Sequence, residues 1–186
     1  MLKDYFELLS LPKKLVIDHN ELKKQYHKLV KTYSTDPVLD KLNEKMDDKE
    51  KLKLVETAYR TLKDRFERIV HLLEVEGITF KKDRAPTQFV ELEQRVDTVL
   101  EKVKSGDEKK IEELKILHQD ILNQFSTVSV ELAHLEKAWD ASNDNVDEVE
   151  EGAAQAQGLL KKLGRKSAAF NYIRLVEQNV RLAVNS

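Results

Sequence analysis

The sequence predicts an all-α protein in which a small helical hairpin is joined to an elongated antiparallel three-helix bundle. Of its 186 residues, 35% are charged and 40% are apolar, while Gly and Pro number only five and three. This composition suits long surface helices, whereas a sheet protein needs frequent turn residues. Apolar residues also recur every three or four positions over most of the chain, which is the period of an amphipathic helix.

A short apolar element over 4–9 and a longer helix over 18–32 open the hairpin. The first stops at Ser10-Leu11-Pro12, because proline disfavours helix at the residue before it. Asp18 is the expected N-cap of the second, with Glu21 completing a capping box. From Leu22 to Tyr33, apolar residues step by four, three and four, so they form one face. The opposite side carries Lys23, Lys24, His27, Lys28 and Lys31.

Pro37 ends the second helix, and 34–46 is predicted to be a loop. One further helix is expected from near Asp48 to Leu73, with Gly77 as its stop. Two antiparallel helices with the first element across them make a domain over 1–76, about 75 residues and near the lower limit for independent stability. The sequence predicts a linker over 77–86.

Residues 87–186 are predicted to form the three-helix bundle, its first helix short and the other two long. Ser105-Gly106-Asp107 and Asn143-Asp144-Asn145 mark the turns between them. The heptad spacing is typical of coiled-coil-like packing, and it suits an intramolecular hairpin and a dimer equally well. Each glycine inside the last helix costs about 0.5–1 kcal/mol relative to alanine, which favours a kink near Gly164.

The composition excludes several classes of function. The absence of cysteine removes disulfides, thiolate metal sites and a cysteine nucleophile. A net charge of −2 gives no indication of nucleic acid. The chain shows no nucleophile with a base, no Walker loop and no dinucleotide fingerprint, so we expect neither enzymatic activity nor a cofactor.

We expect no metal site and no membrane segment. His118 lies on an apolar stripe, and His134 lies sixteen residues on, without a carboxylate at ligand spacing on that stripe, whereas zinc needs three or four converging ligands. His118 is therefore interpreted as a hydrogen-bonded interior group that helps to fix helix register. No apolar run is long enough to span a bilayer. The N-terminus lacks signal- and transit-peptide features, so the expected location is the cytosol, most simply that of a bacterium.

Three segments carry a family resemblance. They are Asp4-Tyr5-Phe6-Glu7-Leu8 followed by Leu11-Pro12, Ala58-Tyr59-Arg60-Thr61-Leu62-Lys63-Asp64, and Arg68-Ile69-Val70-His71-Leu72-Leu73. The frame resembles a J-domain, the module that switches on heat-shock ATPase chaperones. With the C-terminal helices, nearly the whole chain resembles the HscB-type J-protein, the co-chaperone of bacterial iron–sulfur cluster assembly. In the third segment that family has an Arg-Ala-Glu-Tyr-Leu-Leu type of sequence.

The turn after the second helix departs from that family. The family carries His-Pro-Asp there, and this chain reads Ser34-Thr35-Asp36. Proline restricts φ and removes a backbone donor, and Ser34 and Thr35 replace neither that restraint nor the histidine ring. Asp36 keeps a carboxylate that can pair with an arginine, and Pro37 still stiffens the loop. We therefore expect little or no ATPase stimulation.

The resemblance implies two binding surfaces. A heat-shock ATPase chaperone of the DnaK/HscA type would contact Lys23, Lys24, His27, Lys28, Lys31, Ser34, Thr35 and Asp36. An iron–sulfur scaffold protein would contact an apolar patch around Phe89, Val90, Leu92 and Phe170. Each set also has a plainer interpretation, since the basic residues suit a solvated helix face and Phe89 fits the core stripe. Val90 lies off that stripe and is the better candidate for an exposed contact.

The resulting hypothesis is a co-chaperone-like protein that tethers an iron–sulfur scaffold or similar client to the chaperone, with weak or absent ATPase stimulation. The alternative is a non-catalytic helical adaptor or assembly protein, in which the J-like domain is only a scaffold. A third possibility is an intact stimulator that uses Asp36 alone.

Overall fold

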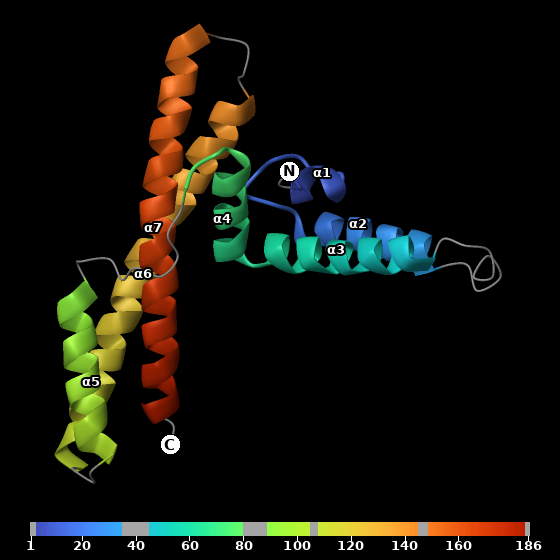
Figure 1. Cartoon of the computed structure of the whole chain (residues 1–186). Coiled ribbons are helices and arrows are strands. Elements are labelled where there is room, and N and C mark those ends of the chain that lie inside the picture. Colours follow the sequence, from blue (N-terminus) through green and yellow to red (C-terminus); the bar gives the residue numbers. More distant parts are fainter. Residues whose placement is uncertain (1–2, 35–44, 80–88, 105–107, 145–148, 185–186) are drawn as a thin grey trace. The chain divides into compact units, whose positions relative to one another are not determined.

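The computed structural model describes residues 3–34, 45–79, 89–104, 108–144 and 149–184. The secondary-structure elements in these ranges are α-helices, and the described residues form no strand (Figure 1). The expected all-α fold class is therefore confirmed. Among the described helices, none combines the length and apolar character that crossing a bilayer requires.

The helices follow one another along the chain with the bounds α1 Tyr5–Leu8, α2 His19–Ser34, α3 Lys45–Lys63, α4 Arg65–Val75, α5 Val90–Lys104, α6 Glu108–Asp144 and α7 Val149–Val184. The last three contain 15, 37 and 36 residues, as expected for one short and two long helices. α7 continues as one helix through Gly158 and Gly164, so these glycines do not end it.

The start of α2 confirms Asp18 as its cap. Its Oδ1 accepts from the backbone N–H of Asn20 at 2.8 Å and of Glu21 at 3.4 Å, as N-cap side chains do. The Glu21 carboxylate accepts from Gln25 at 2.7 Å and from Lys24 at 3.0 Å. These bonds, that of Gln25 first, lower the pKa of Glu21. Glu21 thus supports the first turns of the helix through side-chain pairs.

The single helix expected from Asp48 to Leu73 is wrong, because α3 ends at Lys63 and α4 begins at Arg65. Asp64 between them has extended backbone angles, and its carboxylate accepts from the Glu67 backbone N–H at 3.0 Å. An aspartate in this conformation is a helix N-cap, so it starts a new helix although the apolar spacing continues through it.

The end of α4 confirms Gly77 as a helix stop. Gly77 has a φ of 72°, a conformation that glycine adopts without steric cost. The Ile78 N–H donates to the Leu73 carbonyl at 2.7 Å, and the Gly77 N–H donates to the Glu74 carbonyl at 3.1 Å. This pair of bonds is a Schellman motif, which satisfies carbonyls that the helix end leaves unpaired.

The chain forms two compact units that do not follow a single cut in the sequence. Unit 1 contains residues 1–80 together with 136–160, and unit 2 contains 81–135 together with 161–186. The C-terminal end of α6 and the N-terminal part of α7 therefore belong with the first four helices. The domain boundary at 77–86 remains a prediction about the sequence.

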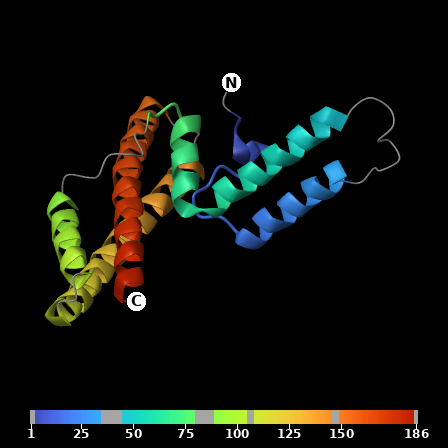
Figure 2. The ribbon, with the colours of Figure 1, turned by 60° about the horizontal axis from the view of Figure 1, so that its bottom comes forward.

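In unit 1, α2 and α3 lie side by side, and α1 and α4 also pack against α3 (Figures 1 and 2). The Tyr26 and Tyr59 rings stack across the α2–α3 hairpin with centroids 4.3 Å apart. Fully buried apolar side chains complete the interior: Phe6, Leu9, Leu15, Leu22, Val55, Leu62, Ile69, Leu72 and Leu73. This burial supplies the main stabilising term for so small a hairpin.

In unit 2, aromatic pairs join α7 to the other two helices. Phe89, just before α5, stacks on Tyr172 with centroids 5.5 Å apart, and Phe125 of α6 stacks on Phe170 at 5.2 Å. His118 Nε2 donates to Glu177 at 3.1 Å, across α6 and α7. The expectation that His118 is hydrogen-bonded is confirmed.

Candidate functional site

The basic residues expected to meet a chaperone all lie on the solvent side of α2. Lys23, Lys24, His27, Lys28 and Lys31 are exposed, whereas Leu22 is buried against the hairpin. Lys24 also pairs with Glu21 at 3.0 Å. The cap at Asp18 and the Tyr26–Tyr59 stack hold α2, which carries these four lysines and His27 on its solvent side.

The turn that follows α2 is only partly described. Ser34 is the last residue of α2 and is exposed. Thr35 and Asp36 lie outside the described residues, so the geometry of the expected chaperone-contacting turn stays a prediction. Before the turn, at the end of α2, the Tyr33 ring centre lies 5.9 Å from the Lys51 ammonium, a cation–π distance. That contact ties the last turn of α2 to α3.

The apolar patch expected to meet a client divides into three buried residues and one exposed residue. Phe89, Leu92 and Phe170 are 4%, 9% and 7% exposed, while Val90 is 41% exposed. The Phe89 ring stacks on Tyr172, and the Phe170 ring stacks on Phe125. In the free chain, Val90 is therefore the member of this set that a partner can reach directly.

Carboxylates accompany Val90 on α5. Glu91, Glu93 and Asp97 are all exposed. Burial raises the pKa of the Tyr172 hydroxyl to about 12, and the nearby Glu93 carboxylate adds to that shift. The start of α5 thus combines one exposed apolar side chain with negative charge, over an aromatic layer formed by Phe89 and Tyr172.

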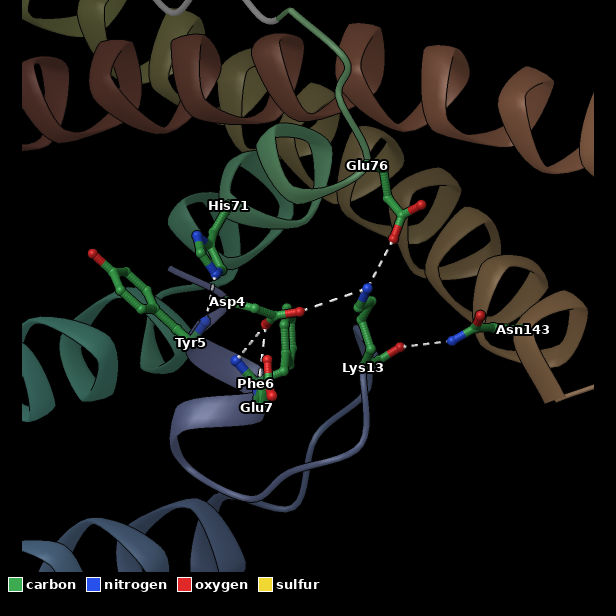
Figure 3. A network of polar contacts seen from close by, with 8 residues as sticks. All are labelled: Asp4, Tyr5, Phe6, Glu7, Lys13, His71, Glu76 and Asn143. Carbon is green, nitrogen blue, oxygen red and sulfur yellow. Dashed lines mark hydrogen bonds and ion pairs between the residues drawn. The ribbon is translucent and has the colours of Figure 1, made fainter. Parts of the chain in front are cut away.

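A polar network in unit 1 was not anticipated from the sequence. Asp140 on α6 is 8% exposed and uses both carboxylate oxygens on the segment between α1 and α2. It accepts from the Leu15 N–H at 2.7 Å and from the Val16 N–H at 2.8 Å. Asn143 donates to the Lys13 carbonyl at 3.0 Å (Figure 3). We call residues 13–16 the α1–α2 strap.

Two arginines of α4 complete this network. Arg68, 5% exposed, donates through Nε to the Leu15 carbonyl at 3.0 Å and through Nη1 to the Leu62 carbonyl. Arg65 donates to both oxygens of the buried Glu136 at 2.8 and 2.7 Å. Burial lowers the pKa of the Arg68 guanidinium, and the Glu136 carboxylate opposes that shift. Paired and hydrogen-bonded in this way, these buried charges satisfy the condition under which charges are tolerated in an interior.

His71 of α4 contacts Tyr5, the first residue of α1. Its Nε2 accepts from the Tyr5 N–H at 2.9 Å, and its ring stacks on the Tyr5 ring with centroids 4.2 Å apart (Figure 3). Lys13 pairs with Glu76 at 3.2 Å and with Asp4 at 3.6 Å. The sequence carried a signal for the buried His71, which interrupts the otherwise apolar run 69–73, and a weaker one for Arg68, which directly precedes that run. Charged or polar side chains in a helix buried all round require partners.

The described residues contain no gathering of three or more histidine, aspartate or glutamate side chains that could hold a metal ion. The exposed features described for the two units are the basic side chains of α2 in unit 1 and, in unit 2, the apolar Val90 with neighbouring carboxylates at the start of α5.

Comparison with solved structures identifies the fold. The chain is similar to the chaperone HscB from Vibrio cholerae, with a TM-score of 0.56 and 22% identity over 96% of this chain and 99% of that one. It is also similar to the human co-chaperone protein HscB, with a TM-score of 0.60 and 17% identity over 97% of this chain and 81% of that one. Neither the family models nor the curated protein sequences gave a match. The structural likeness therefore shows a fold of the HscB type.

Proposed function

We propose that this chain is a co-chaperone-like protein that acts by binding and not by catalysis. It tethers an iron–sulfur scaffold protein or similar client to a heat-shock ATPase chaperone of the DnaK/HscA type. The observation that carries the proposal is the likeness to HscB structures over nearly the full length of both this chain and the Vibrio cholerae protein. A J-like hairpin alone would support a chaperone partner but not a second surface for a client.

The chaperone surface that we propose comprises Lys23, Lys24, His27, Lys28 and Lys31 of α2 with Ser34, Thr35 and Asp36 of the following turn. Exposure of all five basic side chains on one helix supports it. The four lysines attract an acidic partner surface and speed the encounter, with an effect that weakens as salt rises. Because the turn lacks the family's histidine and proline, we propose that docking occurs with weak or absent stimulation of ATP hydrolysis.

Charge reversal tests the chaperone surface. The double variant Lys24→Glu with Lys28→Glu should bind the chaperone several-fold more weakly at low salt, with the difference shrinking at high salt. Lys53→Glu, at an exposed position of α3, is the matched control and should bind as the wild type does. If the α2 double variant and Lys53→Glu lost chaperone affinity equally, α2 would be rejected as the contact surface. Steady-state hydrolysis with the chain titrated in tests the second part, and strong acceleration would overturn weak stimulation.

The client surface that we propose comprises Phe89, Val90, Leu92 and Phe170, of which Val90 is the exposed member. Val90→Asp should weaken capture of the scaffold protein, because it places a charge at the exposed apolar position. Val130→Asp, at a 53% exposed valine of α6 in the same unit, is the matched control. If the two variants capture the scaffold equally well, the patch is wrongly assigned.

A non-catalytic adaptor remains the second candidate, because unit 2 exposes further large apolar side chains. Ile116, Leu175 and Leu182 are 55%, 48% and 66% exposed, and exposed apolar side chains such as these can be buried against a second molecule. Sedimentation of the purified chain separates the two functions. Concentration-dependent self-association without capture of chaperone or scaffold would favour the adaptor. Capture of both by a monomer, from a bacterial cytosol, would favour the co-chaperone.

A further inference from the structure

The buried His71 ring has one nitrogen committed as an acceptor. The side chain is 4% exposed, and its Nε2 lies 2.9 Å from the Tyr5 backbone nitrogen. A backbone N–H can only donate, so Nε2 must carry a lone pair. The ring is therefore neutral in the folded chain, with its proton on Nδ1.

The same ring holds α1 in place. Tyr5 is the first residue of α1, and its N–H is one of the groups that a helix start leaves without an intrahelical partner. His71 supplies that partner and stacks on Tyr5 at 4.2 Å with an interplanar angle of 14° (Figure 3). It also faces Phe6 at 5.9 Å. A helix of four residues has little intrinsic stability, so α1 depends on this docking.

Protonation would reverse the contact. A second proton, on Nε2, would face the Tyr5 N–H, replacing a hydrogen bond by two opposed donors and placing a cation in a buried position. The charges that act on the ring, among described residues, are Asp4 before α1, Glu74 on α4 and Lys13 in the α1–α2 strap, while α3 adds none. Burial is the largest influence and lowers the pKa of His71, Lys13 acts in the same direction, and the two carboxylates oppose them.

We propose that His71 is a proton-operated latch for α1, holding 4–9 on α4 while the ring is neutral and releasing them when it gains a proton. Phe6 and Leu9 are 1% and 0% exposed, and α1 packs against α3, so release uncovers part of the hairpin interior. The latch follows from contacts inside unit 1 and does not rest on the proposed function.

The sign of the pH dependence follows from linkage. A histidine whose folded pKa is depressed binds fewer protons folded than released, so the docked state is favoured above the ordinary pKa of about 6.5. As the pH falls below that value, release takes up one proton and its equilibrium constant rises about tenfold for each pH unit, until the folded pKa is reached.

Nuclear magnetic resonance on the full chain tests the latch without a substitution. Side-chain nitrogen shifts should show His71 protonated on Nδ1 near neutral pH, with a midpoint below about 6.5. The protection of the Tyr5 amide against hydrogen exchange, corrected for its intrinsic rate, should fall about tenfold for each pH unit below that value. A proton on Nε2 at neutral pH, or a midpoint at or above the ordinary value, would overturn the proposal.

A substitution supplies the second test. His71→Gln keeps an amide oxygen as many bonds from the backbone as Nε2, so it can accept from Tyr5, but it does not titrate. The protection of the Tyr5 amide should then lose its pH dependence between pH 7 and 5. His134→Gln removes an exposed histidine and should leave that dependence as in the wild type. If His71→Gln keeps the full dependence, another group operates the release and the latch is rejected.

Discussion

Replacing Asp140 by alanine should destabilise unit 1 by about 2–4 kcal/mol, because the backbone N–H groups of Leu15 and Val16 both lose the carboxylate that accepts from them. Leu15 is 1% exposed, so its N–H would stay buried without a partner after the 2.7 Å bond to Asp140 is lost. Losing such a bond to a charged acceptor costs about 1.5–3 kcal/mol. Val16 is 54% exposed, so water can reach its N–H and the cost there is about 0.5–1 kcal/mol.

The single tryptophan makes the measurement specific. Trp139 is 4% exposed, belongs to unit 1 and precedes Asp140 in the sequence. Its fluorescence during urea unfolding therefore reports on unit 1, and linear extrapolation gives the free energy of unfolding. Circular dichroism recorded in parallel shows whether the two units unfold together, which decides whether a two-state treatment applies. Hydrogen exchange at the Leu15 amide adds a local readout.

Two further variants bracket the result. Asp140→Asn keeps one carbonyl oxygen and turns an NH2 group towards the second donor, so its loss should be smaller than that of alanine but still measurable. Lys24→Ala is the control within unit 1, since the Lys24 side chain is 72% exposed and pairs with Glu21 at 3.0 Å. Exposed pairs contribute less than about 1 kcal/mol. If Asp140→Ala lost no more stability than Lys24→Ala, with unchanged denaturant slope, the proposed role of Asp140 in holding the α1–α2 strap would be refuted.

Three other outcomes are expected. Arg65→Ala should destabilise unit 1 by about 2–4 kcal/mol, because the buried Glu136 carboxylate loses its guanidinium partner. Urea unfolding followed by Trp139 fluorescence measures this loss of stability, and a loss under about 1 kcal/mol would contradict the prediction. Phe170→Ala should lower the stability of unit 2 by about 3–5 kcal/mol, because it leaves a cavity in a packed interior. Thermal or urea unfolding measures this loss, and client capture by the variant should be compared only at temperatures where the variant is folded. Burial raises the pKa of the Tyr172 hydroxyl to about 12, above the ordinary tyrosine value of about 10, so the stability that this residue contributes is retained below about pH 10 and lost as the pH rises from there towards 12. Ultraviolet titration of Tyr172→Phe should lack the component with that midpoint.

The sequence was sufficient for elements that local residues determine. Apolar spacing predicted α2 and the three C-terminal helices, and Asp18 and Gly77 were correct as a cap and a stop, because capping bonds join residues a few positions apart. The break at Asp64 was missed although its signal is local. The apolar stripe runs on through Leu62, Phe66 and Ile69, and periodicity alone cannot distinguish one long helix from two that share a face.

Contacts between distant residues could not be predicted in the same way. Asp140 binds Leu15, which lies 125 positions away in the chain, and helical periodicity specifies a face but never the partner of that face. The client patch shows the opposite case. Departure from the heptad stripe identified Val90 as the accessible member, and its exposure contrasts with the burial of Phe89 and Phe170. For the same reason, on-stripe residues are poor candidates for direct recognition.

The α1–α2 strap links the stability of unit 1 to its proposed chaperone surface. Leu15 and Val16 lie just before Asp18, which caps α2, so the bonds from Asp140 restrain the chain where the basic helix begins. A variant of Asp140 can therefore weaken chaperone capture without touching the partner. Such a loss should accompany the loss of stability and persist at high salt. Charge reversal on α2 should instead weaken capture at low salt, while stability falls by less than about 1 kcal/mol from the exposed Lys24–Glu21 pair. Salt dependence thus separates residues that contact the chaperone from residues that position α2.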